Sequence, residues 1–426
     1  METPEQPFGR RALDVMRPGP FRRYIVGSAI SDTGTWMQVM AQAWVMSTLT
    51  DRALVLGLVN FAAGLPTLAL TMFGGSVADR YDKRIILIIA QLVQMALALI
   101  IGWLVLTGRV QIWHVLVLAS VLGITIAFEM PALSALVPEL VKREQIATAV
   151  ALDRSVFHGS RLIGPSVAGI IVARWGAATA FFANAFTFLA LIIAMLSIPA
   201  RKRGTAEEEE QRRSGMMEGV RFIRNEPTIL ALIGLIAATT IFVYPVVSVM
   251  LPLYVKNILQ LGPDRLGFLM AVSGIGSLSG SIGLLSIARG KRLLFIKCAV
   301  GTVAAMVLVM SLAESFAVTA TAMGLLSVGM ATNFGLANTI VQERAPSHLR
   351  GRISAVFGLS FFGLMPIAGL IVTGFADLVG MRHALTAAAI CYAITAFLFL
   401  RKAKHTNPLE EQPPAEPEPA ASATVG

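Results

Sequence analysis

Five charged side chains in the first half of the sequence stand in stretches that are otherwise apolar. The acids are Asp32, Glu129 and Asp153, and the bases are Arg154 and Arg161. Ionised groups are costly in an apolar interior, so they usually face a cavity or one another and mark an ion or substrate pathway. Asp153 could equally be a helix-end charge. We predict a proton-coupling or substrate cavity lined by Asp32, Gln38, Gln42, Glu129, Arg154 and Arg161.

The basic residues of this set share one helix face. Arg154, His158 and Arg161 follow one another at helical spacing, which places them on the same side of a helix. An acid at similar depth would lower the desolvation cost of an arginine, so we expect Glu129 to pair with Arg154 or Arg161. The pair could simply hold two helices together. Alternatively, Asp32 or Glu129 could exchange a proton when its partner is drawn away.

The composition identifies the elements that must position these groups. Of the 426 residues, 55% are apolar and 14% are charged, against about 25% charged residues in an ordinary soluble domain. The mean hydropathy of +0.71 excludes a disordered chain. A helix needs about 20 residues to cross a bilayer core. Stretches of that length predict transmembrane helices at 24–49, 54–78, 85–106, 112–138, 146–173, 177–198, 228–255, 266–288, 293–312, 316–342, 353–376 and 382–400.

The distribution of lysine and arginine predicts the orientation of these twelve helices. Cytoplasmic loops retain basic residues during insertion, and 26 of the 35 Lys and Arg residues fall on the side that carries both termini, against six on the other side. We therefore expect a multi-pass protein of the bacterial inner membrane with both termini in the cytoplasm. The few basic residues on the other side are Arg52, Arg109, Arg174, Lys256, Arg265 and Arg382.

The loops divide the chain into two halves of six predicted helices each. The one long loop is charged and Glu-rich, and the tail is Pro-rich, so we expect a solvated linker and a disordered tail. The expected parts are an N-terminal arm (1–23), an N-terminal bundle (24–198), a linker (199–227), a C-terminal bundle (228–400) and a cytoplasmic tail (401–426).

Corresponding loops of the two halves are similar in sequence. GGSVADRYDKR (74–84) follows the second predicted helix, and GLLSIARGKR (283–292) follows the eighth. Both contain a glycine ahead of a final Lys-Arg pair. Two parallel six-helix repeats with a site between them form the architecture of alternating-access carriers. The predicted fold is therefore an all-α membrane protein built from two six-helix repeats.

The first of these loops resembles the loop signature of the major facilitator superfamily. This resemblance implies the major facilitator fold and a cytoplasmic gate, in which the acid of the loop latches the two halves together. The alternative is that the bases serve membrane topology alone. The matching positions are Gly75, Asp79, Arg80, Lys83 and Arg84.

The fifth predicted helix resembles the antiporter motif of the same superfamily. GSRLIGPSVAG (159–169) matches that motif at Gly164, Pro165 and Gly169, and Ser160 and Ala168 replace two of its glycines. Small residues allow close helix contact, and the proline favours a bend. The resemblance implies an exporter.

Longer stretches resemble a narrower bacterial efflux branch, which contains the enterobactin exporter and related drug and macrolide efflux proteins. This resemblance covers residues 21–400 and implies a secondary transporter that exports a small amphipathic molecule, such as a siderophore or a drug, by proton antiport. The stretches with the clearest resemblance are 31–44, 128–140, 251–269 and 349–358.

Other classes of function lack support in the sequence. No phosphate-binding loop, HExxH motif or Gly-x-Ser-x-Gly elbow occurs, so we do not expect an enzyme or an ATP-driven pump. Two cysteines and five scattered histidines do not suggest a metal site or a cofactor. The expected partners are a small-molecule substrate, protons and lipid, with no nucleic acid, and the expected state is a monomer. A proton-coupled uptake carrier, or less readily a channel, remains an alternative.

Overall fold

The structure is a computed structural model that describes residues 8–199 and 216–402. In these two ranges, all regular secondary structure is helical. Large apolar side chains are exposed along many of the helices, for example Met72 at 81% and Leu378 at 84%. Such surfaces suit a lipid environment. The predicted all-α membrane fold is confirmed.

Residues 8–199 form seven α-helices. Pro20 begins α2 with a backbone angle already suited to a helix, and Asp82 caps α4 by accepting a hydrogen bond from the backbone N–H of Arg84 at 3.0 Å. The helices are α1 (Phe8–Val15), α2 (Pro20–Leu49), α3 (Ala53–Arg80), α4 (Lys83–Leu106), α5 (Ile112–Glu139), α6 (Ile146–Trp175) and α7 (Ala177–Ser197), with a 3-10 turn, η1 (Arg143–Gln145), before α6.

After residue 215, the described chain starts with α8, which lies within the predicted linker, and continues with shorter helical pieces as well as long ones. The pieces are α8 (Met216–Asn225), α9 (Pro227–Phe242), α10 (Tyr244–Ser248), α11 (Leu251–Leu253), η4 (Tyr254–Ile258), α12 (Pro263–Gly283), η5 (Leu284–Ser286), η6 (Arg289–Lys291), α13 (Arg292–Leu312), α14 (Phe316–Arg344), α15 (Arg350–Gly358), η7 (Leu359–Gly363), α16 (Met365–Val379) and α17 (Met381–Lys402).

Eleven helical stretches of the described chain are long and apolar enough to cross a membrane. They correspond to the second through twelfth predicted spans. The first predicted span is α2, whose 30 residues are long enough to cross but include Asp32, Gln38 and Gln42. These polar side chains lower the hydropathy of α2 without shortening it.

Two predicted spans differ from the structure because they are not regular α-helices. The span predicted at 228–255 is divided into α9, α10, α11 and η4. Pro245 is the second residue of α10 and Pro252 is the second residue of α11, and proline cannot donate the hydrogen bond that would continue the preceding helix. The span predicted at 353–376 contains a π-helical turn, η7, just before Pro366. The helix predicted to reach residue 288 ends as α12 at Gly283.

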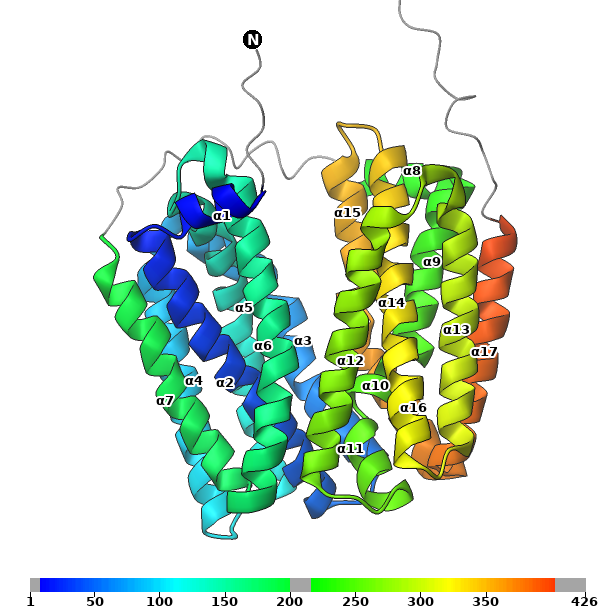
Figure 1. Cartoon of the computed structure of the whole chain (residues 1–426), viewed down its shortest axis with the longest axis horizontal. Helices are drawn as coiled ribbons and strands as arrows, with labels where there is room; N and C mark the ends of the chain where they lie inside the picture. Colours follow the sequence, from blue (N-terminus) through cyan, green and yellow to red (C-terminus); the bar gives the residue numbers. More distant parts are fainter. Residues whose placement is uncertain (1–7, 200–215, 403–426) are drawn as a thin grey trace, which may run out of the picture.

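The long helices form two bundles that lie side by side (Figure 1). In the N-terminal bundle, α2 packs against α6 and α7, α3 against α5, and α4 against α7. In the C-terminal bundle, α14 packs against α12 and α13, and α17 packs against α9 and α13. The bundles meet where α6 packs against α12 and α3 against α16.

The bundles approach each other closely at one end only. We call the end with α1, α8 and the last turn of α17 the terminal face, and the other end the opposite face. The bundles converge toward the opposite face and diverge toward the terminal face (Figure 1). At the opposite face, Asp377 of α16 accepts hydrogen bonds from the first backbone N–H groups of α3, at 2.6 Å from Ala53 and 3.1 Å from Leu54. This arrangement closes the opposite face.

A second polar contact joins the bundles at the opposite face. Lys256 of η4 donates to the carbonyl oxygen of Ser47 at 2.6 Å and to the carboxylate of Asp51 at 2.9 Å. Asn257 also donates to Asp51, at 3.2 Å. Both contacts connect residues more than 200 positions apart in the sequence.

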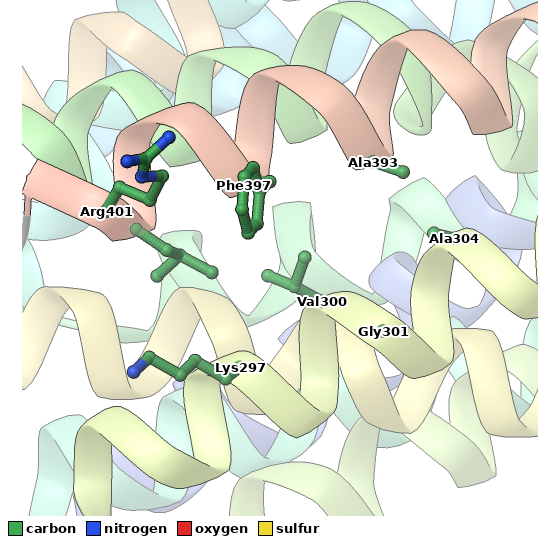
Figure 2. A pocket seen from close by; sticks show the side chains of 8 residues that line it. Lys297, Val300, Gly301, Ala304, Ala393, Phe397 and Arg401 are labelled. Atoms are coloured by element: carbon green, nitrogen blue, oxygen red, sulfur yellow. The ribbon is translucent and has the colours of Figure 1, made fainter.

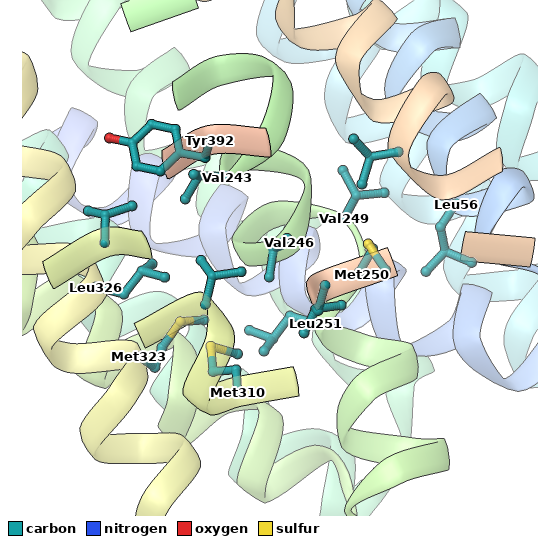
Figure 3. Close-up of a cluster of buried hydrophobic side chains, with 14 of the residues drawn as sticks. Leu56, Val243, Val246, Val249, Met250, Leu251, Met310, Met323, Leu326 and Tyr392 are labelled. Carbon is teal, nitrogen blue, oxygen red and sulfur yellow. The ribbon is translucent and has the colours of Figure 1, made fainter. Parts of the chain in front are cut away.

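A continuous apolar core supports the broken helix of the C-terminal bundle (Figure 3). Buried side chains from α10 and α11 meet side chains of α13, α14 and α17, and Leu56 of α3 belongs to the same cluster. Tyr254 is buried in this core and donates to the carbonyl oxygen of Met310 at 2.8 Å. The core therefore extends from one bundle into the other.

Candidate functional site

Three acids from three helices of the N-terminal bundle form one electrostatic cluster. Asp32 lies on α2, Glu129 on α5 and Asp153 on α6. The charge of Asp32 repels those of Asp153 and Glu129. None of the three acids forms an ion pair within residues 8–199 and 216–402. We call Asp32, Glu129 and Asp153 the acidic cluster.

Glu129 is held by two amides of the neighbouring helix. Gln91 and Gln94 of α4 donate to its two carboxylate oxygens at 2.7 and 2.5 Å. Ser31 of α2 donates to Gln91 at 2.9 Å and extends the chain of hydrogen bonds. Both glutamines are buried, whereas Glu129 is partly exposed. The carboxylate is therefore oriented by neutral donors and keeps some access to solvent.

The other two acids accept hydrogen bonds from hydroxyl groups of α2. Ser28 donates to Asp32 at 2.9 Å, one helical turn away. Tyr24, of which only 1% is exposed, donates to Asp153 at 2.6 Å. Tyr24 was not among the site residues predicted from sequence. It would be found only by knowing that α2 and α6 are neighbours, since a tyrosine in an apolar helix is otherwise an ordinary core residue.

The predicted pairing of Glu129 with Arg154 or Arg161 is not present. Gln91 and Gln94 already occupy both carboxylate oxygens of Glu129. Arg154 is exposed, and Arg161 instead lies over the ring of Trp36, with its guanidinium carbon 5.2 Å from the ring centre. Neutral donors on α4 therefore replace the expected arginine.

Arg161 belongs to a small cationic and aromatic cluster on α2 and α6. Trp36 and Phe157 meet edge to face, with ring centres 5.9 Å apart, and Phe157 contacts His158 at 5.7 Å. An arginine over a tryptophan is stabilised by about 0.5–2 kcal/mol. The cluster combines positive charge with flat apolar surfaces, which suits an amphipathic molecule with an anionic or aromatic group.

One of the two predicted cavity glutamines of α2 contributes to helix packing. Gln38 accepts a hydrogen bond from Asn184 of α7 at 2.7 Å, and Asn184 is fully buried. Gln42, one turn later, is partly exposed. Gln38 therefore fastens α2 to α7 rather than standing free in a cavity.

The gate motif lies at the terminal face. Lys83 pairs with Glu139 at 2.8 Å and Arg84 with Asp82 at 2.5 Å, and both pairs stay within the N-terminal bundle. Arg84 holds the pKa of the Asp82 carboxyl below its ordinary value. Asp79 and Arg80 are exposed.

One glycine of the gate loop has a packing role. Gly74, next to the predicted Gly75, lies so close to α5 that a Cβ atom there would be 3.0 Å from the Cα of Phe128. A Cβ atom at Gly75 would meet nothing within 4 Å. The close approach of α3 and α5 therefore requires Gly74.

The antiporter-like motif lies between two helix contacts of α6. A Cβ atom at Gly164 would be 2.7 Å from the carbonyl oxygen of Thr33 on α2. A Cβ atom at Gly169 would be 3.0 Å from the carbonyl oxygen of Pro263 and 3.1 Å from Gly267, both on α12 of the other bundle. Small residues here allow backbone contact. The motif thus forms part of the contact between bundles.

The C-terminal bundle contributes an aromatic cluster. Phe361 of η7 contacts Tyr244 at 5.4 Å, Phe362 at 5.0 Å and Phe334 at 5.2 Å between ring centres. Phe334 also contacts Phe357 at 5.3 Å. Phe334 and Phe357 were not singled out from sequence, because apolar residues in a predicted membrane helix carry no signal of their own.

Known proteins similar to this chain are membrane transporters. The family of transmembrane secretion effectors matches residues 12–425. The multidrug efflux pump Tap of Mycolicibacterium fortuitum is 25% identical over 376 residues, which cover 85% of this chain and 91% of that protein. Macrolide efflux protein A of Streptococcus pyogenes is 23% identical over 363 residues, covering 84% of this chain and 89% of that protein.

Solved structures with the same fold are also transporters. A bacterial homologue of the human lysosomal transporter Spinster, in an inward-facing and unoccupied conformation, superposes with a TM-score of 0.67 at 14% identity, over 94% of this chain and 98% of that one. The nucleoside transporter NupG superposes with a TM-score of 0.70 at 10% identity, over 91% of this chain and 100% of that one. The chain belongs to the transmembrane secretion effector family of the major facilitator superfamily, and it is a multi-pass membrane transporter rather than an enzyme.

Proposed function

We propose that this transporter exports a small amphipathic organic molecule, drug-like or siderophore-like, by proton antiport. The observation that supports this most is the acidic cluster. The charge of Asp32 repels those of Glu129 and Asp153, and the three acids have no basic partner in the described residues. Binding of a proton to one acid removes repulsion from the others. A change in the distance or hydration of the cluster therefore changes its proton affinity.

The proposed cycle uses the two bundles as rocking units. With the opposite face closed, the acids exchange protons with the terminal side, and substrate binds between the bundles. After the bundles rock, substrate leaves from the opposite face and protons return to the acids. Coupling requires that the protonated and substrate-bound states do not coexist. Asp32 is central because its charge interacts with both other acids.

The proposed substrate class follows from the cationic and aromatic side chains of the two bundles. Arg161, Trp36 and Phe157 offer a cation and flat rings on the N-terminal side, and Phe361 and its neighbours offer rings on the C-terminal side. The names of the two efflux relatives, a multidrug pump and a macrolide efflux protein, agree with an amphipathic organic substrate.

We also propose the membrane orientation and a gate. The excess of Lys and Arg at the terminal face supports a cytoplasmic location for both termini in a bacterial inner membrane. Asp79 is exposed beside bases that are already engaged within their own bundle. It would latch the bundles at the terminal face when that face closes. Transport by Asp79→Asn is expected to fall while its membrane abundance stays unchanged, and full transport would exclude the latch.

The test of direction uses intact cells and a protonophore. Cells that produce the protein are loaded with ethidium or a labelled macrolide, and retention is compared with cells that lack the protein. If export is driven by protons, cells that produce the protein retain less of the compound than cells that lack it. The protonophore is expected to abolish this difference. Higher retention would instead indicate proton-coupled uptake. Retention that is low with or without the protonophore would exclude proton coupling.

A further inference from the structure

A groove runs between α13 and α17, near the terminal face (Figure 2). These two helices lie on the side of the C-terminal bundle that faces away from the N-terminal bundle (Figure 1). The groove encloses about 410 Å³, a volume within the range of small-ligand sites. Its lining residues are Lys297, Val300, Gly301 and Ala304 from α13 and Ala393, Phe397, Leu400 and Arg401 from α17.

The charged residues of the groove are both basic. Lys297 lies five residues after the start of α13 at Arg292, about 7 Å along the helix axis at about 1.5 Å per residue. Arg401 lies in the last turn of α17. Among residues 8–199 and 216–402, no Asp or Glu lines the groove, so none of these residues neutralises its positive charge.

Both basic side chains can present their charged ends to a ligand. Lys297 is exposed, and a long lysine stem can lie on apolar surface while its ammonium reaches the polar boundary of the membrane. The Arg401 guanidinium carbon lies 5.7 Å from the centre of the Phe397 ring. Contact with a ring face leaves the N–H edge of a guanidinium free to bind an anion.

The rest of the groove is apolar and open. Val300 forms its floor with 6% exposure, and Phe397 forms a wall with 61% exposure. A Cβ atom built at Gly301 would meet nothing within 4 Å, so the backbone at this position borders empty space. A flexible hydrocarbon chain fits such a surface, whereas a hydrated ion alone would leave it uncovered.

We propose that this groove binds an anionic phospholipid of the leaflet at the terminal face. The phosphate lies between the Lys297 ammonium and the Arg401 guanidinium, and an acyl chain follows the apolar surface past Gly301. Basic pockets between membrane helices bind anionic headgroups through the same combination of charge and apolar contact. A zwitterionic lipid offers the same chain but no net negative charge.

The test compares lipids on the full-length protein purified in detergent. Binding of dioleoyl phosphatidylglycerol and dioleoyl phosphatidylcholine is measured by native mass spectrometry and by the shift in thermal unfolding with added lipid. The unmodified protein is expected to bind phosphatidylglycerol in preference to phosphatidylcholine and to unfold at a higher temperature with it. Equal binding of the two lipids would overturn the proposal, since bulk lipid contact would then suffice.

Charge variants locate the headgroup. Lys297→Gln with Arg401→Gln is expected to weaken phosphatidylglycerol binding about tenfold or more, the effect of losing a charge-assisted hydrogen bond. Lys291→Gln with Lys402→Gln is the matched control, because both side chains are exposed nearby but do not line the groove. Equal loss in the two double variants would contradict a specific site.

A filled groove tests the acyl chain without a change of charge. Gly301→Leu places a side chain into the open space and is expected to reduce retained phosphatidylglycerol while the protein stays folded. Ala305→Leu adds the same side chain to an exposed position of α13 outside the groove and is expected to bind lipid normally. Normal binding by Gly301→Leu would rule out the groove as the site.

Discussion

At the scale of single residues, Asp32 is the group on which the proposed coupling depends most. Its charge interacts with those of both Asp153 and Glu129, and one hydroxyl, that of Ser28, donates to it. Asp32→Asn keeps the size of the side chain but removes the charge. We expect this variant to lose accumulation against a gradient driven by a pH difference, while substrate still equilibrates across the membrane.

The control for Asp32→Asn is Asp14→Asn on α1. Asp14 pairs with Arg17 at the surface, at 2.9 Å, and lies outside the acidic cluster. Cells with Asp14→Asn are expected to retain as little ethidium as cells with the unmodified protein. If Asp32→Asn still drives uphill export, Asp32 is not the proton carrier.

Asp82 stabilises the polar end of α4 through an ion pair and a helix cap. Arg84 lowers the pKa of this carboxyl below its ordinary value of 3.8. Because the pKa is lowered, the interaction between the Asp82 carboxylate and Arg84 stabilises the folded state fully above pH 3.8. This stabilisation is lost as the pH falls through the lowered pKa. Asp82→Ala also removes the N-cap of α4, which is worth about 1 kcal/mol.

We therefore expect Asp82→Ala to unfold at a lower temperature than the unmodified protein throughout pH 5–8. Thermal unfolding followed by tryptophan fluorescence in detergent would measure the difference at several pH values. A difference that disappears already near pH 6 would contradict the assigned pKa direction.

Sequence patterns located the acids but not their partners. Residue spacing gives the depth of Asp32, Glu129 and Asp153 along their helices, and the structure brings these three charges together. Spacing does not say which helices are neighbours or how they are rotated. Glu129 therefore accepts from glutamines of α4 where an arginine of α6 was expected.

At the scale of elements, the contact between α6 and α12 holds the bundles together in this conformation. Gly267 of α12 is in close contact with Gly169 of α6, since a Cβ atom at Gly267 would be 2.9 Å from the Cα of Gly169. Gly267→Val overpacks this contact, and such changes typically cost about 1–3 kcal/mol. The variant is expected to populate the state in which the opposite face is open.

Alkylation of an introduced cysteine can measure that shift. After replacement of Cys298 and Cys391, which are both exposed, a cysteine at Ser166 of α6 is expected to react faster from the opposite face in Gly267→Val. Gly283→Val on the same helix is the control, because a Cβ atom at Gly283 meets nothing within 4 Å. Unchanged reactivity in Gly267→Val would show that this contact does not set the conformation.

Hydropathy predicted where helices cross the membrane but not where they break. A run of apolar residues measures how far a segment can extend through lipid. Hydropathy does not indicate that Pro245 and Pro252 interrupt the backbone hydrogen bonds of the helix. The segment 228–255 was therefore predicted as one helix, although its prolines, read alone, signal the breaks.

At the scale of the whole molecule, polar contacts at the opposite face favour the observed conformation. Lys256 joins the bundles through Ser47 and Asp51, and it holds the pKa of the Asp51 carboxyl below its ordinary value of 3.8. The contact is present above pH 3.8 and is lost only as the pH falls through the lowered value. Mild acidification, to about pH 5, is therefore not expected to open this face.

Removal of the lysine, by contrast, is expected to open the opposite face. In Lys256→Gln, spin labels at Arg109 and Glu314 should show a larger population of long distances, and labels at Lys142 and Lys291 a larger population of short ones. Arg265→Gln is the control, since Arg265 contacts Asp264 and Phe316 of its own bundle. Identical distance distributions in Lys256→Gln and the control would contradict this role of Lys256.

The conformation could not be predicted from sequence, although the similarity of the two halves could. Matching loops after the second and eighth helices indicated a repeat, and repeats imply a site between them. A carrier must adopt one conformation with the opposite face closed and another with it open. One sequence therefore encodes the contacts of both conformations. The contacts of Asp377 with the start of α3 were not visible in any local pattern.

The proposed transport cycle depends on the exchange of protons for substrate at the acidic cluster. Purified protein in liposomes that contain a pH-sensitive dye tests it directly, with ethidium added outside and no other ion gradient. The unmodified protein is expected to move protons in the direction opposite to ethidium, and the triple variant Asp32→Asn, Glu129→Gln and Asp153→Asn to move none. Proton movement at the native rate in the triple variant would contradict the mechanism.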